Sequence, residues 1–404
     1  VREAAKASDS TKMERVDVMT DKGYNPNRAV TMRATSHPYL GCSVYYSVVS
    51  GGFSKLMLAL ENSSGLMYSH RLIGIDQLAG VRYVVCRESS MVPYGFEKKS
   101  ETLYENTEPT SIGYVYHAYM SENTADELDA LDLQNALLHA AVVSENSSLL
   151  KQAENAGLQE VKEAEKTSLP FTMTDRKSFE WNHGVLKIKR KNGSFRTQIT
   201  MRPGYEYYLR FRGLKIKKSE KNALWANVTM GDLVREFMIS DETYDFHLDR
   251  DNYMVTLGSV TEEQTKELRF RMNGPAVYTL QDIEVVEVSM ENYHESVQDL
   301  MQNPMTEVKK QKNGIAGKVT NKEDGILCLA VPYRQGYRLT VDGKETEIQE
   351  INKMYVGAYL EKGENYAILL TYETPGLKIG VILTIIGVIF AISLVIFDKK
   401  SLHK

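Results

Sequence analysis

The chain has 404 residues, of which 42% are hydrophobic and 25% are charged, and its formal net charge is -4. This length is enough for about two or three compact domains. Acidic and basic residues are interleaved without a basic stripe or patch, which excludes nucleic acid as a partner. The 24 tyrosines far outnumber the two tryptophans, and tyrosine favours strands. We therefore predict an α+β fold that is mainly β.

The first part of the sequence, residues 1–165, mixes helix and strand signals, and we predict a mixed α/β domain there. Val81–Val85 has the β-branched and aromatic content of a buried strand. Thr124 opens a Thr-Ala-Asp-Glu capping box, which predicts a helix start. Residues 151–169 are rich in Glu, Lys and Gln and are interpreted as a solvated helix or a linker. The expected helix places its apolar residues on one face, namely Leu133, Leu137, Leu138 and Ala141.

Residues 166–292 change to a period of two, which is typical of strands. In 195–202, apolar Phe195, Ile199 and Met201 alternate with polar residues. Asn192-Gly193 lies between this stretch and the apolar residues Leu186 and Ile188, which predicts a hairpin. Pro203-Gly204 predicts a turn into a further strand. The later strands are expected at Tyr253–Leu257, Leu268–Met272 and Asp282–Val288. Short strands with frequent turns predict a β-sandwich of the jelly-roll kind.

Residues 293–375 predict a short helix followed by a small second β unit. Tyr293, Val297 and Leu300 have helical spacing. The apolar run Ile326–Val331 and the alternating residues 337–341 predict strands, and Asp342-Gly343 is a type I′ hairpin signal. Alternation over 366–372 predicts a last strand directly before the membrane segment.

A membrane helix is predicted over residues 376–398. Ile379–Phe397 contains no charge and is long enough to cross a hydrocarbon core of ~30 Å. Lys378 stands where its aliphatic stem can reach back to the interface. Lysines follow the helix in residues 399–404, so the positive-inside rule predicts a cytoplasmic tail. Residues 1–375 would then lie outside the cytoplasm.

The sequence opens at Val1 without a charged region and a following apolar stretch, so it contains no signal peptide. Export of residues 1–375 then requires membrane helices upstream of Val1 or a tail-anchor route. We favour upstream helices, and expect the chain to be the end of a longer protein.

The cysteines and histidines give no metal or redox site. Cys42, Cys86 and Cys328 are far apart and lack Cys-x-x-Cys spacing. An odd number cannot form a complete disulfide framework, and a Cys42–Cys86 bridge stays open as an alternative. Cys328 stands in an apolar run, which predicts a small buried residue. The eight histidines are scattered without ligand spacing, so we expect no metal and no cofactor.

The search for catalytic motifs finds no credible set, since G-x-S-x-G, P-loop and G-x-G-x-x-G patterns are absent. Asp249-Arg250-Asp251 is an acid-x-acid triplet of the kind that can hold a divalent cation. It stands between Phe246 and Tyr253 in a β-rich region, and Asp dominates turns, so we predict a polar turn and no metal site.

Two tryptophans are the candidate carbohydrate-binding residues. Trp181 and Trp225 both lie in the predicted sandwich, and either ring could stack on a sugar. Filling of the core, or a hydrogen-bonded position at its rim, is the commoner role of tryptophan. Both readings stay open.

Several short motifs, in order along nearly the whole chain, resemble the C-terminal part of the bacterial YfhO-like membrane proteins. The most specific are Leu329–Tyr337, similar to the family's "l-s-i-P-Y-d-x-G-W", Val341–Lys344, similar to "v-D-G-k", and Tyr372–Gly380, similar to "Y-x-P-P-G-x-x-x-G". A single Pro375 stands where the family usually has two prolines. Weaker matches are Lys12–Val16, Gly23–Asn27, Ser47–Leu56, Leu78–Val85, Tyr104–Asn106 and Ile112–Tyr116.

The resemblance implies a polytopic protein of glycosyltransferase-C-like architecture that acts in glycosylation of cell-envelope polymers such as lipoteichoic acid. Its partners would be membrane lipid, a polyprenyl-phosphate-linked sugar as donor and an envelope glycopolymer as acceptor. The family architecture places essential acidic residues in an early loop that this sequence lacks, so no catalytic residue is carried over. This part would bind the acceptor or serve the architecture. The alternatives are a single-pass surface module for carbohydrate binding or adhesion, and a scaffold within an envelope complex.

Overall fold

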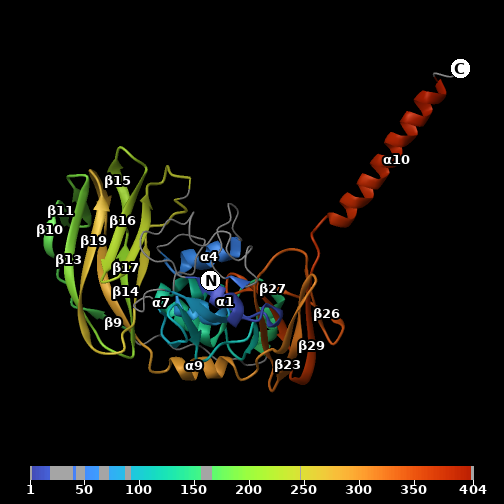
Figure 1. Ribbon diagram of the computed structural model, residues 1–404, viewed down its shortest axis with the longest axis horizontal. Coiled ribbons are helices and arrows are strands. Elements are labelled where there is room, and N and C mark those ends of the chain that lie inside the picture. Colours follow the sequence, from blue (N-terminus) through green and yellow to red (C-terminus); the bar gives the residue numbers. More distant parts are fainter. Residues whose placement is uncertain are drawn as a thin grey trace.

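A computed structural model of the protein describes residues 2–18, 40–41, 51–62, 72–86, 92–155, 166–245 and 247–401. Predictions on residues 23–27, Cys42, 47–50, 156–165, Phe246 and 402–404 lie outside the described residues. The fold is mainly β with helices, as predicted. Figure 1 shows a β-sandwich at one end, a mixed body in the middle and a β-rich part beside a long projecting helix, α10.

The mixed body begins with a sheet of order β2-β1-β3-β5-β4, in which β1 pairs in parallel with β2 and β3. The predicted strand at Val81–Val85 is β3, and its side chains at 81 and 84 are fully buried. The elements up to β5 are α1 (Arg2–Ala7), η1 (Ser10–Lys12), β1 (Arg15–Val18), β2 (Leu40–Gly41), α4 (Gly51–Ala59), α5 (Ile73–Leu78), β3 (Val81–Val85), β4 (Phe96–Lys98) and β5 (Leu103–Asn106).

The predicted helix after Thr124 is in fact two helices, α6 (Glu122–Glu127) and α7 (Ala130–His139). The capping prediction for Thr124 is wrong, because Ser121 caps α6 and the Asp129 carboxylate caps α7 by accepting from the N–H groups of residues 131 and 132. Leu128 between them is extended, which ends the first helix. Ala141 already belongs to strand β8 (Ala141–Val143). The other three residues of the predicted face are buried, as expected: Leu133, Leu137 and Leu138.

Strands from both ends of the chain share one sheet, of order β6-β24-β28-β27-β8-β7. The Asn352 side chain fixes this union, since its Oδ1 accepts from Val142 N at 2.7 Å and its Nδ2 donates to the Tyr116 hydroxyl at 3.1 Å. Cys328 is fully buried in the sheet, as predicted. The strands are β6 (Gly113–Tyr116), β7 (Tyr119–Ser121), β8, β24 (Gly325–Pro332), β27 (Gln349–Ile351) and β28 (Tyr355–Leu360). The sequence pattern did not reveal this long-range pairing, and the predicted domain boundaries stay a prediction.

A second sheet in this half, of order β22-β23-β29-β25-β26, leads into the membrane helix. The hairpin predicted at Asp342-Gly343 is confirmed: both residues have positive φ, 50° and 76°, and they join β25 to β26. The predicted helix is α9. The bounds are α8 (Ser148–Asn155), α9 (Tyr293–Leu300), β22 (Thr306–Gln311), β23 (Gly314–Asn321), β25 (Tyr337–Val341), β26 (Lys344–Thr346) and β29 (Gly363–Tyr372).

The sandwich consists of antiparallel sheets of order β10-β13-β19-β16-β17, β18-β14-β21-β9 and β11-β12-β20-β15 around a hydrophobic core. The predicted alternation in β13 is confirmed, since Phe195, Ile199 and Met201 are buried. The bounds are β9 (Lys166–Leu169), β10 (Thr174–Lys177), β11 (Phe179–Asn182), β12 (Val185–Ile188), β13 (Asn192–Met201), β14 (Tyr205–Arg212), β15 (Lys215–Ser219), β16 (Ala223–Met230), β17 (Leu233–Ser240), β18 (Tyr253–Gly258), β19 (Gln264–Asn273), β20 (Ala276–Thr279) and β21 (Asp282–Ser289).

Two details of the sequence interpretation are wrong in the sandwich. Asn192-Gly193 does not form a hairpin turn, because both residues belong to β13, and β12 pairs with β11 and β20 instead. Gly193 serves close packing: a Cβ there would lie 2.4 Å from Ile188 Cδ1 and 2.6 Å from Ser178 O. Residues 166–169, expected in a helix or linker, form β9 at the edge of a sheet.

The sandwich joins the mixed body through a buried cation. The Arg210 guanidinium, with 2% of its side chain exposed, lies 3.4 Å from Glu61, 3.4 Å from Asp129 and 3.5 Å from Glu284. The Lys166 ammonium bridges Asp129 and Asp132 at 2.5 Å each. Arg210 therefore holds carboxylates of both parts, and Lys166 of the sandwich holds two carboxylates of the mixed body, which fixes how the two parts dock.

Helix α10 (Leu377–Ser401) leaves the last sheet through Gly376, whose φ is +78°. Its window Leu377–Leu394 is apolar, and none of it is buried against the rest of the protein. At ~1.5 Å per residue the helix is long enough to cross a bilayer. Such a surface is stable in lipid and not in water, so α10 is the predicted membrane helix.

Candidate functional site

Trp225 lies on the solvent face of the β13 sheet, with half of its surface exposed. Its neighbours along β16, Leu224 and Ala226, point into the core. Beside it on the same face, Asn227 Nδ2 donates to Glu236 Oε1 at 3.3 Å. An open indole flanked by polar groups suits stacking on a sugar ring.

Trp181 is placed differently. It lies on β11, is half-buried against the sandwich core, and its Nε1 donates to Leu280 O at 2.8 Å. This is the hydrogen-bonded rim position that sequence reasoning considered. The structure therefore brings the two tryptophans to different sheets and leaves Trp225 as the accessible ring.

The acid triplet at 249–251 begins in a turn at residues 248–249, with Asp249 at a φ of 53°, and its other two residues are irregular. Asp251 lies 3.4 Å from the Lys215 ammonium and 3.8 Å from His247 Nε2. Within the described part of the chain, no group of three or more His, Cys, Asp or Glu side chains is arranged to hold a metal ion. Cys86 is buried, and the open question of its pairing involves Cys42, which lies outside the described residues.

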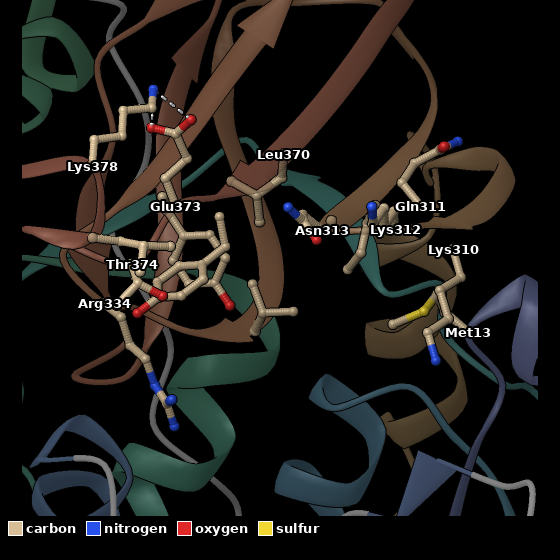
Figure 2. Close-up of a pocket in the computed structure, with 16 residues that line it drawn as sticks. Met13, Lys310, Gln311, Lys312, Asn313, Arg334, Leu370, Glu373, Thr374 and Lys378 are labelled. Atoms are coloured by element: carbon tan, nitrogen blue, oxygen red, sulfur yellow. Dashed lines mark hydrogen bonds and ion pairs between the residues drawn. The ribbon is translucent and has the colours of Figure 1, made fainter. Parts of the chain in front are cut away.

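A pocket of about 660 Å³ lies where the last β-sheet meets the membrane helix (Figure 2). We call it the foot pocket. Its walls come from the β22–β23 hairpin, the start of β25, the end of β29 and the first turn of α10. The lining residues are Met13, Lys310, Gln311, Lys312, Asn313, Gly314, Ile315, Val331, Arg334, Tyr337, Leu370, Tyr372, Glu373, Thr374, Leu377 and Lys378.

Two glycines allow the walls of the foot pocket to close. A Cβ on Gly314 would lie 1.9 Å from Leu370 O, so only glycine lets β23 approach β29 at this point. Gly336 has a φ of +101°, and a Cβ there would lie 2.2 Å from Glu373 O. Backbone hydrogen bonds hold the same walls, with Tyr372 N donating to Asn313 O at 2.8 Å and Glu373 N to Gly336 O at 2.9 Å. The pocket is thus formed by backbone as much as by side chains.

The floor of the foot pocket is apolar and aromatic. Ile315 and Leu370 are buried there, and the rings of Tyr337 and Tyr372 meet edge to face with centroids 5.2 Å apart. Burial raises the pKa of the Tyr337 hydroxyl.

The rim of the foot pocket is cationic. The described lining residues include one carboxylate, Glu373, and four cations: Lys310, Lys312, Arg334 and Lys378. Lys378 Nζ contacts Glu373 Oε1 at 2.8 Å, and this hydrogen bond lowers the pKa of the Glu373 carboxyl. The side chains at 310, 312 and 334 make no ion pair with any carboxylate in the described ranges. Figure 2 shows Arg334 and Lys378 on one side and Lys310 and Lys312 on the other. The arrangement can bind an anion.

Sequence reasoning noticed Lys378 only as a membrane-interface residue and missed the rest of this rim. A usable signal was present: the cationic run 309–312 stands at a hairpin, and Arg334 stands in the motif that leads to Gly336. What the sequence could not show is that this hairpin and this motif meet beside the start of α10.

Residues 7–384 match the protein family described as "Bacterial membrane protein YfhO". A curated relative from Bacillus subtilis (strain 168), named "Uncharacterized protein YfhO", is 26% identical over 315 residues, which cover 74% of this chain and 33% of the relative. The chain therefore spans about a third of the length of that relative.

Several solved structures resemble part of the chain. A cycloisomaltooligosaccharide glucanotransferase of Paenibacillus sp. has 10% identity over 52% of this chain and 46% of its own, with a TM-score of 0.18. A GH2 beta-galacturonidase of Eisenbergiella tayi has 10% identity over 52% of this chain and 37% of its own, with a TM-score of 0.20. The arabinofuranosyltransferase AftD of Mycobacteria has 9% identity over 45% of this chain and 20% of its own, with a TM-score of 0.16. Likenesses at these TM-scores carry no inference about function.

Proposed function

Because this chain belongs to the YfhO family of bacterial membrane proteins, we propose that it is the extracytoplasmic C-terminal part of a polytopic protein that glycosylates cell-envelope polymers such as lipoteichoic acid. The proposed donor is a sugar on a polyprenyl phosphate. This part of the protein binds the polymeric acceptor or holds the architecture around it. A lipid-linked donor must be met at the membrane, whereas a rigid ectodomain can position a polymer at a distance from it.

The observation that carries the proposal is the position of α10. An apolar helix leaves the folded part at one end, and the sandwich with Trp225 lies at the opposite end in Figure 1. Lysines follow the apolar segment in the sequence, at 399, 400 and 404. The positive-inside rule favours a cytoplasmic tail and hence an external position for the folded part.

Topology is tested by adding protease to intact cells that have been stripped of their wall. We expect residues 2–375 to be digested from outside, while an epitope after residue 404 stays protected until the membrane is permeabilised. Protection of the folded part in intact cells would overturn both the topology and the proposed role.

Acceptor binding is tested by calorimetry with the full chain in nanodiscs, titrated with purified lipoteichoic acid. We expect Trp225→Ala to weaken binding by about tenfold, since loss of one aromatic stacking contact costs ~1.4 kcal/mol. Leu248→Ala removes another exposed side chain from the sandwich and should leave binding unchanged. Equal effects of the two variants, or no effect of Trp225→Ala, would remove the acceptor-binding part of the proposal.

The exposed Trp225 also favours a second candidate, a surface module for carbohydrate binding or adhesion without catalysis. The two candidates differ in cells. Deletion of the full gene should abolish sugar attachment to the polymer if the protein is part of a glycosylating enzyme. Polymer that keeps its sugar in the deletion strain, together with glycan binding by the chain, would select the second candidate.

A further inference from the structure

The foot pocket adjoins the first turn of the membrane helix, and Leu377 and Lys378 belong to both. When α10 is inserted, the pocket therefore lies at the level of the lipid headgroups. We propose that the foot pocket binds the phosphate group of a membrane lipid. This inference needs α10 in the membrane but does not depend on a role in glycosylation.

The charge of the rim is the first support. The buried Lys353 ammonium pairs with Asp126 at 2.6 Å, and the buried Arg210 guanidinium lies within 3.5 Å of three carboxylates. At the foot pocket, Lys310, Lys312 and Arg334 have no such match in the described part of the chain. Arginine and lysine side chains that line one pocket are the donors that recognise phosphate.

The floor is the second, independent support. A site for a free anion needs only donors and cations, yet this one has an apolar floor at Ile315 and Leu370 that continues to Leu377 on the membrane helix. The Tyr337 and Tyr372 rings also line the pocket. Tyrosine suits a boundary with an apolar and a polar side. Such a floor fits the glycerol or first methylene groups behind a phosphate, which favours a lipid over a soluble phosphate.

Size and rigidity agree with this ligand class. About 660 Å³ lies within the range of small-molecule sites, enough for a headgroup and the beginning of its chains. The walls are fixed by the close contacts at Gly314 and Gly336 and by the backbone hydrogen bonds of residues 372 and 373. A pocket of this kind binds without reorganisation of its walls.

The test uses the full chain in detergent micelles and native mass spectrometry to measure the retained lipid as a function of added phosphatidylglycerol. The pocket variant is Lys312→Gln with Arg334→Gln. The matched control is Lys309→Gln with Arg338→Gln, which removes the same charge from exposed residues of β22 and β25 that do not line the pocket. We expect the pocket variant to weaken lipid binding at least tenfold and the control less than twofold.

Four further results decide the proposal. Equal losses in both double variants would show diffuse attraction to the surface and would overturn it, as would unchanged binding in the pocket variant. Inorganic phosphate that displaces the lipid at equal concentration would overturn the assignment to a lipid. Undecaprenyl phosphate serves as a second lipid probe. Tenfold weaker binding of both lipids by the pocket variant supports recognition of the shared phosphate group, and the lipid that binds more tightly shows whether a phosphate monoester or diester is preferred. The four substituted side chains are exposed, so circular dichroism should show unchanged unfolding.

Discussion

Arg210 and Arg334 carry the same side chain in opposite settings. The Arg210 guanidinium is buried and lies within 3.5 Å of three carboxylates, one of them in the sandwich and two in the mixed body. Arg334 is exposed at the rim of the foot pocket, without an ion pair to any described carboxylate. The Arg210 guanidinium is paired with carboxylates of the protein itself and fixes the docking of the sandwich on the mixed body. The Arg334 guanidinium is available to a ligand. We therefore expect Arg210 to contribute to stability and Arg334 to contribute to binding.

The largest effect is expected from removing the buried cation. Arg210→Met leaves the carboxylates of Glu61, Asp129 and Glu284 in a half-buried site with their shared partner gone. Loss of one partner of a buried ion pair typically costs about 3–5 kcal/mol. The variant should therefore unfold at clearly lower urea concentration, measured by circular dichroism on the full chain in detergent.

Its control is Arg212→Met, two residues along the same strand. The Arg212 side chain is 39% exposed and pairs with Glu284 at 3.3 Å. Exposed ion pairs contribute about 0–1 kcal/mol, so this variant should stay close to the wild type. Equal losses for the two arginines would break the distinction between structural and available cations.

The next largest loss of stability is expected at Asn352, in the sheet that strands from both ends of the chain share. Asn352 has a φ of 53°, so Asn352→Gly removes the side chain without backbone strain. Val142 N–H then lacks its acceptor inside the protein, and an unsatisfied buried donor costs about 1–3 kcal/mol. Asn365→Gly, at an exposed position with a φ of 55°, is the matched control and should cost little. Urea unfolding of both variants measures the difference.

Predictability from the sequence follows the range of the interactions involved. Asp342-Gly343 and Asn192-Gly193 are the same local signal, yet the first forms a turn and the second lies within β13. The difference arises because the Ile188 side chain packs directly against the backbone of Gly193, where a Cβ would clash. This contact joins two sheets and cannot be read from the local sequence pattern. Alternation in β13 and the uncharged run of α10 depend on neighbours in sequence, and both were predicted correctly.

The candidate sites show the same limit. Trp225 was found because a tryptophan is visible in any sequence. That Trp225 is exposed while Trp181 is half-buried depends on how their strands are packed in the sandwich. The foot pocket was missed because its cations come from the β22–β23 hairpin, the approach to β25 and the start of α10. Each segment alone resembles an ordinary solvated stretch, and only the pairing of β23 and β25 with β29 brings them together.

The smallest effect concerns pH and the carboxylate side of the buried cluster. Burial alone would raise the pKa of the Asp129 carboxyl, but the hydrogen bonds from Lys166 and from Asp132 N, with the Arg210 charge, lower it to about 2. Its pKa in the unfolded chain is ~3.9. The folded pKa is therefore depressed, and the stabilisation is complete above pH ~4 and disappears as the pH falls through about 2.

Asp129→Asn tests this account because asparagine caps a helix as well as aspartate does and removes only the charge. Since 24% of the Asp129 side chain is exposed, solvent screening reduces the linkage energy, and we expect a loss of about 1–2 kcal/mol at pH 7. Urea unfolding between pH 7 and pH 2 should show a smaller fall in stability for the variant than for the wild type below pH 4. Asp175→Asn, at an exposed position on β10, should follow the wild type throughout. A variant at position 129 with the wild-type pH profile would mean that the charge of Asp129 contributes nothing to the docking of the sandwich, and that Arg210 and Lys166 hold it through Glu61, Glu284 and Asp132.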